Sequence, residues 1–204
     1  MALLNHWNDY YRSIPHGSEL EISKFIFDNN VNLRIGRCLC LGSGLGQNAR
    51  YLASLGHNVT AVDFSDQAIF VSKEEANLAG LKITHHLENI DHYAIPWERY
   101  DTIVCCRLTI FTVKYPKLLR SIKYGLKSGG TLLLEGYTIN HQENEHSFLY
   151  SWFYGIDPDS TKEVLKDLCI KTQLINDREI YENDQSSLQN EFDYEYFQLI
   201  AKKR

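Results

Sequence analysis

The sequence predicts an α/β fold: a Rossmann-like, mostly parallel sheet of seven strands with helices on both faces and an antiparallel strand pair at its C-terminal end. Three observations support this. Short apolar or β-branched runs alternate with segments of helical spacing along most of the chain. A glycine-rich turn joins the first strand to the helix after it. The last two strands, residues 172–181 and 192–201, have no helix between them, so they must pair antiparallel.

Five strands are predicted before this late pair. Each is a short run of apolar or β-branched residues bounded by glycine, polar residues or a turn. In chain order they are residues 38–41, 57–63, 81–87, 100–106 and 131–135. The fourth is the most apolar, which is typical of a central strand in a parallel sheet.

Helices are predicted from their capping residues and from periodic apolar positions. In chain order they span about residues 18–28, 47–55, 65–80, 115–126 and 160–168. The first begins with a capping box at Ser18, the third with the N-cap Ser65, and the last with Ser160. The chain has no Pro/Gly-rich linker, repeat or low-complexity stretch, so we expect a single domain over residues 1–204.

Composition is typical of a cytoplasmic enzyme with a sizeable core. The chain has 204 residues, of which 44% are hydrophobic, and a net charge of -5. Its only basic run is the short 202–204 tail, which argues against nucleic acid or an anionic membrane as the main partner. The first residues lack the features of a signal peptide, and no stretch approaches the roughly eighteen apolar residues of a membrane helix.

The cysteines and histidines do not form a predicted metal site. Five cysteines are present, none of them in C-x-x-C spacing, and the eight histidines are scattered. Four of the cysteines lie in predicted buried strands, where a free cysteine behaves as a small hydrophobe. An odd count without a secretion signal indicates a reducing compartment.

Three glycines at alternate positions, Gly42, Gly44 and Gly46, follow the first predicted strand. Glycine permits a positive φ and lacks the Cβ that would hold a ligand away from the backbone. The turn also directs the amides of a helix N-terminus toward a ligand. The alternative interpretation is a tight βα turn with a purely structural role.

The second predicted strand ends in Asp63, seventeen positions beyond Gly46. This is close to the spacing of about twenty residues at which an acid contacts ribose hydroxyls in dinucleotide-binding folds. A carboxylate accepts hydrogen bonds from both hydroxyls of a ribose. A solvated turn aspartate is the alternative. Together the glycines and Asp63 indicate an adenosine-containing ligand.

These motifs resemble those of the class I S-adenosylmethionine-dependent methyltransferases, over about residues 21–202. The specific features are the Leu-Gly-Ser-Gly-Leu-Gly turn at 41–46 and the Val-Asp-Phe-Ser segment at 62–65. The Trp/Tyr-rich start at residues 7–11 and the Gln-Asn-Ala that follows the turn resemble the small group of tellurite-resistance and thiol-type methyltransferases.

The resemblance implies S-adenosylmethionine as cofactor and S-adenosylhomocysteine as its product. It implies a cofactor site made of Gly42, Ser43, Gly44, Gly46, Asn48, Asp63, Phe64, Asn89, Ile90, Cys106 and Arg107. The glycines would line the methionine half, Asp63 would bind the ribose, and Phe64, Asn89 and Ile90 would contact the adenine. One departure concerns Cys40, because members of the family usually carry an acid there that helps to organise the cofactor's amino group.

The acceptor side of the site is predicted where the fifth strand opens into a polar loop. Glu135, Tyr137, His141 and His146 are the candidate groups there, and Tyr137 and His141 are the catalytic candidates. Solvated histidines are the alternative interpretation. The N-terminal segment, residues 1–17, with Tyr10 and Tyr11, is a candidate lid, and simple aromatic packing is its alternative.

The predicted function is methyl transfer to a small molecule, with a thiol or chalcogen compound as one candidate acceptor. A soft, ionised acceptor needs no general base, whereas a hydroxyl benefits from one. Two other functions stay open: a nicotinamide-dependent oxidoreductase and a non-catalytic S-adenosylmethionine-binding module. No metal, nucleic acid or membrane is expected as a partner, and the chain is expected to be a monomer or a homodimer.

Overall fold

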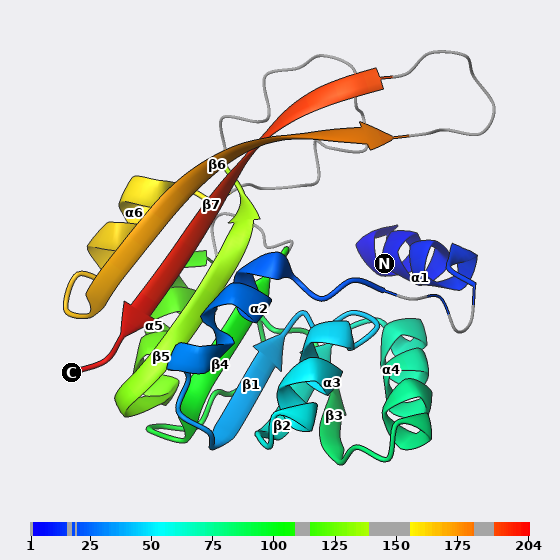
Figure 1. The fold of residues 1–204 in the computed structure, drawn as a ribbon, viewed down its shortest axis with the longest axis horizontal. Helices are drawn as coiled ribbons and strands as arrows, with labels where there is room; N and C mark the ends of the chain where they lie inside the picture. The colour runs from blue at the N-terminus through cyan, green and yellow to red at the C-terminus, as the bar shows by residue number, and fades with distance from the viewer. Residues whose placement is uncertain (1, 16–17, 19, 109–114, 139–155, 182–189) are drawn as a thin grey trace.

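A computed structural model of the chain describes residues 2–15, 18, 20–108, 115–138, 156–181 and 190–204. Its centre is a seven-stranded sheet with the order β3-β2-β1-β4-β5-β7-β6 (Figure 1). The strands are β1 (Arg37–Leu41), β2 (Asn58–Asp63), β3 (Ile83–Leu87), β4 (Tyr100–Cys106), β5 (Leu126–Tyr137), β6 (Cys169–Tyr181) and β7 (Asn190–Lys202). Strands β1 to β5 are parallel, and β7 runs antiparallel to both β5 and β6. The predicted fold class is confirmed.

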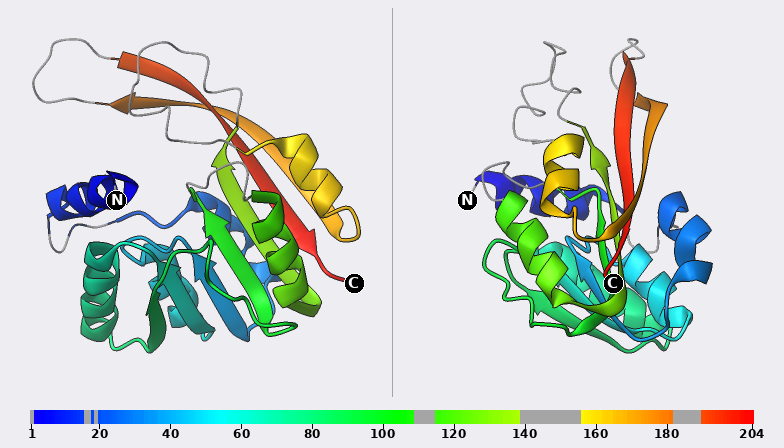
Figure 2. Two further views of the ribbon diagram at one scale, coloured as in Figure 1. Left: turned by 180° about the vertical axis from the view of Figure 1, so that it is seen from behind. Right: turned by 90° about the vertical axis from the view of Figure 1, so that its left-hand side faces the viewer.

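Helices cover both faces of the sheet (Figure 2). The helices are α1 (Ala2–Ser13), α2 (Lys24–Asn29), α3 (Gln47–Ser54), α4 (Asp66–Leu78), α5 (Tyr115–Gly125) and α6 (Pro158–Val164), with a 3₁₀ turn η1 (Asn30–Asn32). Apolar residues of α2 and α3 pack on one face against Cys38, Cys40 and Val104. Helix α5 packs on the other face against Leu39, Ile103 and Leu132. Because both faces are covered, the central strands are apolar throughout.

Two helix starts differ from the sequence prediction. The first predicted helix begins at Lys24 rather than at Ser18, because Ser23 is its N-cap and accepts a hydrogen bond from the Ile26 amide. The last begins at Pro158 rather than after Ser160. There the Asp157 carboxylate caps the helix, accepting from the amides of Asp159 and Ser160.

Two further differences concern the lengths and kinds of elements. The segment at 2–13, predicted only as a candidate lid, is helix α1. Strand β5 starts at Leu126, five residues earlier than predicted, with a register irregularity opposite Tyr100 and Thr102. Residues 88–99, between β3 and β4, form turns and irregular segments, and the sequence predicts no helix there.

The site is placed by the reversal of strand order at β1. The chain runs outward from β1 to β3 and then returns to β4 on the other side of β1. In such sheets, ligands bind in the crevice outside the carboxyl ends of the strands at this reversal. The arrowheads of β1, β4 and β5 point to the edge of the sheet on which α1 lies (Figure 1).

Candidate cofactor-binding site

The glycine turn lies at the carboxyl end of β1 and has left-handed backbone at all three glycines. Their φ values are +61° at Gly42, +52° at Gly44 and +79° at Gly46. The Ser43 amide donates to the Val62 carbonyl at 3.0 Å, and the Gly46 amide donates to the Ser43 carbonyl at 3.0 Å. These bonds fix the turn between β1 and β2.

Neighbouring groups approach the glycines so closely that a side chain would not fit. A Cβ on Gly42 would lie 2.2 Å from Leu108 Cδ1, and one on Gly46 would lie 2.0 Å from Ser72 Oγ. Gly46 is the N-cap of α3 and has no side chain to cap the helix. The first amides of α3 therefore have no side-chain cap, as in helix N-termini that bind ligands.

Asp63 faces this turn from the end of β2. Its Oδ2 accepts from the Gly44 amide at 2.8 Å, and its Oδ1 accepts from the Ser65 amide at 2.9 Å. The residue is 3% exposed. Burial raises the pKa of Asp63 above its ordinary value, although the amides of Ser65 and Gly44 donate to the carboxylate and oppose that rise. The structure thus brings Asp63 and the glycines together, as their spacing predicts.

Helix α1 covers this corner of the site. Ser65 Oγ donates to Asn8 Oδ1 at 2.5 Å, which fastens α1 to the start of α4. Tyr11 lies with its hydroxyl 3.0 Å from the Cβ position of Gly44. Burial, followed by the nearby Asp63 charge, raises the pKa of the Tyr11 phenol, so Tyr11 is neutral at ordinary pH. The candidate lid therefore touches the glycine turn, and its role as a lid stays a proposal.

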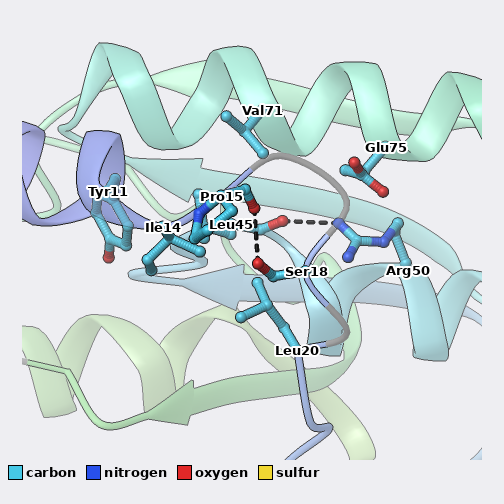
Figure 3. A pocket seen from close by; sticks show the side chains of 9 residues that line it. All are labelled: Tyr11, Ile14, Pro15, Ser18, Leu20, Leu45, Arg50, Val71 and Glu75. Atoms are coloured by element: carbon cyan, nitrogen blue, oxygen red, sulfur yellow. Dashed lines mark hydrogen bonds between the residues drawn. The ribbon is translucent and has the colours of Figure 1, made fainter.

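A small pocket opens beside Tyr11, between the segment after α1 and helices α3 and α4 (Figure 3). On its α3 side the Arg50 Nη1 donates to the Leu45 carbonyl at 2.7 Å. Figure 3 shows the Arg50 guanidinium facing Glu75 of α4. None of the residues predicted to bind cofactor lines this pocket. Leu45 of the glycine turn lines it, but the three glycines do not.

The predicted adenine-side residues lie next to Asp63. Phe64 is half-buried, and Ile90 packs against the core. The Glu88 amide donates to the Asp63 carbonyl at 2.9 Å, so the segment after β3 is fastened to the end of β2. Asn89 is exposed, and its Oδ1 accepts from the Asp91 amide at 2.9 Å. Asn89 thus also shapes the turn that carries it.

The predicted methionine-side residues lie after β4. Arg107 has a φ of +52°, and its amide donates to the Glu135 carbonyl at 2.8 Å. This bend brings Leu108 against Gly42. Burial, followed by the neighbouring Glu135 charge, raises the pKa of the Cys106 thiol, so Cys106 is a protonated thiol at neutral pH.

The acceptor-side candidates are only partly described. Glu135 and Tyr137 lie at the end of β5, where Glu135 is 5% exposed and Tyr137 is half-buried. His141 and His146 lie outside the described residues. Neither catalytic candidate therefore has an established role. Cys40 is buried in β1, with its side chain among apolar neighbours and other thiols.

Two buried polar atoms at the glycine turn have no hydrogen-bond partner among the described residues. They are Ser43 Oγ and Gln47 Oε1. Buried polar atoms are nearly always paired, so such atoms at a turn of this kind fit a ligand that supplies the partner. Asn48, in contrast, already accepts the Ser23 amide through Oδ1 at 2.9 Å. The residues present therefore fit a small polar ligand such as the predicted cofactor.

Sequence reasoning missed Gln47 and the neighbours of Glu135. Gln47 stands directly after the last turn glycine, and this adjacency alone could have marked it. Ser23 and Gln198 contact Glu135 across 112 and 63 positions of sequence. No local signal reveals such contacts, because they depend on the pairing of β5 with β7 and on the place of α2.

Solved structures of methyltransferases share this fold. The structure of TehB from Haemophilus influenzae superposes with a TM-score of 0.73 over 97% of this chain and 67% of that one, at 20% identity. Residues 38–130, which span the glycine turn, Asp63 and the end of β4, match the family model of a methyltransferase domain. The chain therefore resembles the class I methyltransferases in sequence and in fold. The resemblance predicted from the sequence is confirmed.

Curated methyltransferases match this chain over part of their length. The ubiquinone biosynthesis O-methyltransferase of Coxiella burnetii is 28% identical over 124 residues, which is 61% of this chain and 51% of that protein. The probable S-adenosyl-L-methionine-dependent methyltransferase TehB of Haemophilus influenzae is 29% identical over 127 residues, or 61% of this chain and 42% of that protein. The chain matches about half the length of these relatives.

Within the described residues, no group of three or more His, Cys, Asp or Glu side chains is arranged to hold a metal ion. None of the helices in the described part of the chain is long and apolar enough to cross a membrane.

Proposed function

We propose that this protein transfers the methyl group of S-adenosylmethionine to a small-molecule acceptor. The observation that carries the proposal is the turn of three left-handed glycines whose Gly44 amide is held by the buried Asp63. It lies at the strand reversal of a methyltransferase domain. When bound, S-adenosylmethionine supplies an activated methyl group on a positively charged sulfur.

The roles of the chain's own residues follow from their positions. Asp63 binds the ribose hydroxyls, and Phe64 with Ile90 provides apolar contact for the adenine, whose edge Asn89 recognises. The glycine turn lets the backbone approach the methionine half. Burial beneath α1 excludes water, so that these contacts align the methyl group with the acceptor.

For the acceptor, we propose a thiol or chalcogen compound. The similarity to TehB and to the thiol-type group supports it, and an ionised acceptor of this kind needs no general base. The similarity to the ubiquinone biosynthesis O-methyltransferase supports an oxygen acceptor as the second candidate. An oxygen acceptor would need a base, and Tyr137 and His141 are the candidates. The cytoplasmic location, the single domain and the absence of a nucleic-acid partner stay predictions.

The test is a methyl-transfer assay with labelled cofactor and a panel of thiols, selenite, tellurite and catechols. Methylated product from the thiol or chalcogen members supports the proposed acceptor, and product from catechols alone supports the oxygen acceptor. Cofactor binding without product from any member favours the non-catalytic binding module. Binding of NAD in place of S-adenosylhomocysteine favours the oxidoreductase.

A further inference from the structure

Glu135 lies near the carboxyl end of β5. It pairs in register with Cys106 of β4, two positions beyond the row that joins Cys40, Val104 and Leu133. Side chains two positions apart in a strand point to the same face. Glu135 therefore faces the same side of the sheet as Cys40, one step nearer to the carboxyl edge.

A chain of contacts links Glu135 to the first turn of α3. Ser23 Oγ lies 3.4 Å from both carboxylate oxygens of Glu135. The amide of the same Ser23 donates to Asn48 Oδ1 at 2.9 Å. Ser23 thus connects the Glu135 carboxylate to Asn48 in the first turn of α3.

The negative charge of Glu135 is incompletely balanced. Its short partner is the neutral Gln198 amide, whose Nε2 donates at 2.8 Å. Among the cations in the described part of the chain, only the Arg107 Nε comes as near as 4.0 Å, and the Arg107 side chain is 60% exposed. Glu135 is 5% exposed, and its nearest described cation is 4.0 Å away and largely in solvent. Keeping such a carboxylate ionised lowers the stability of the folded protein.

The other buried carboxylates are better compensated. Asp101 lies 2.6 Å from Lys127 Nζ and accepts from the Arg37 amide at 2.9 Å. Asp63 accepts two backbone amides at 2.8 and 2.9 Å. Glu135 has a neutral amide as its short partner, its nearest cation among the described residues is 4.0 Å away, and it lies at the ligand-binding edge of the sheet.

We propose that Glu135 binds the ammonium group of the methionine half of the methyl donor. The inference rests on the proposed function, because that ligand brings a primary ammonium group to this end of the site. The proposal also accounts for position 40. The family resemblance predicts an acid there, and Cys40 has no carboxylate to supply the negative charge. The Glu135 carboxylate replaces that acid from two strands away, and Ser23 and Gln198 orient it.

The test is calorimetric binding of two ligands to the full chain. S-adenosylhomocysteine carries the amino-acid half, whereas 5′-methylthioadenosine has a methylthio group on the adenosine part and lacks the amino-acid half. In Glu135→Gln the new amide still accepts from Gln198, so the fold is retained and only the charge is lost. We expect S-adenosylhomocysteine to bind about tenfold more weakly or worse, and 5′-methylthioadenosine to bind within about twofold of the parent.

Two further variants keep the test decisive. Glu98→Gln removes a carboxylate that pairs with Lys203 away from the glycine turn, and it should change neither affinity. Glu135→Asp keeps the buried charge but shortens the side chain by one methylene. It should weaken the binding of S-adenosylhomocysteine and leave the binding of 5′-methylthioadenosine unchanged. This second variant replaces Glu135→Gln if the amide variant does not fold.

The outcomes separate this inference from the proposed function. Unchanged affinity of Glu135→Gln for S-adenosylhomocysteine overturns the inference and leaves the methyltransferase proposal standing. Equal weakening of both ligands also overturns it, because the change then damages the site as a whole. If the parent chain binds neither ligand, the proposed function fails first.

Discussion

Gly46 and Gly80 have similar left-handed backbones but different surroundings. Their φ values are +79° and +67°, yet a Cβ on Gly46 would meet Ser72 Oγ at 2.0 Å while one on Gly80 would meet nothing within 4 Å. We expect Gly80→Ala to lower the free energy of unfolding by about 1–2 kcal/mol, the cost of left-handed backbone. Gly46→Ala should cost at least about 1 kcal/mol more, because the buried Ser72 must move. Urea unfolding of both variants measures this, and equal losses would contradict it.

Burial of Glu135 makes a prediction about stability and pH. The folded pKa of Glu135 is raised above its ordinary value of 4.5, chiefly by burial. A carboxyl group with a raised folded pKa favours the folded state below its ordinary pKa, and that contribution is lost as pH rises through the folded pKa. Glu135→Gln should therefore melt at a higher temperature than the parent near pH 8.

This gain should shrink as the pH is lowered toward 4.5, since the parent then carries a neutral group at the same position. Melting curves of parent and variant at several pH values provide the measurement. A variant that is less stable than the parent at pH 8 would show that Glu135 is already compensated in the folded chain.

At the residue scale, the sequence predicts the glycines and Asp63 because their chemistry is local. A positive φ and a strand-end carboxylate leave a signature within about twenty positions. The environment of Glu135 leaves none, since Ser23 and Gln198 reach it from α2 and β7. The surroundings of the Glu135 charge are therefore not predictable from the sequence, although Glu135 itself is predicted as an acceptor-side candidate.

At the scale of elements, α1 is fastened to the domain by a buried polar contact. Asn8 is 7% exposed and accepts from Ser65 Oγ. Asn8→Ala should loosen α1 by about 1 kcal/mol, because the buried Ser65 hydroxyl loses its acceptor. Hydrogen exchange should then become faster in α1 and stay unchanged in β1.

Asp9→Ala is the matched control for this change. Asp9 pairs with Arg12 on the surface of the same helix, where both side chains are more than half exposed. Such pairs contribute little, so exchange in α1 should stay near the parent rate. Equal acceleration by both variants would mean that α1 is held by its own helical stability rather than by Asn8.

The wrongly predicted helix starts have a common physical reason. Capping residues at Ser18 and Ser160 satisfied the local rules, but Ser23 and Asp157 cap the helices that form. Several polar residues near a helix start can each serve as cap, and tertiary packing selects among them. For α2, the contacts of Ser23 with Asn48 and Glu135 favour the later start.

At the scale of the whole molecule, the sheet was predictable and its acceptor end was not. Short apolar or β-branched runs predict the five parallel strands, and the missing helix between β6 and β7 predicts the antiparallel pair. Covered on both faces, this sheet leaves its carboxyl edge as the place for a ligand. The acceptor depends on side chains around Tyr137 and His141, whose sequence pattern is compatible with several chemistries.

The central claim is that the glycine turn and Asp63 form a site for S-adenosylmethionine, and calorimetry with the parent chain and Asp63→Ala tests it most directly. We predict saturable binding of S-adenosylhomocysteine to the parent, weaker binding of NAD, and at least about a tenfold loss of S-adenosylhomocysteine affinity in Asp63→Ala, because the ribose loses its acceptors. No binding of S-adenosylhomocysteine to the folded parent, or tighter binding of NAD, would contradict the claim.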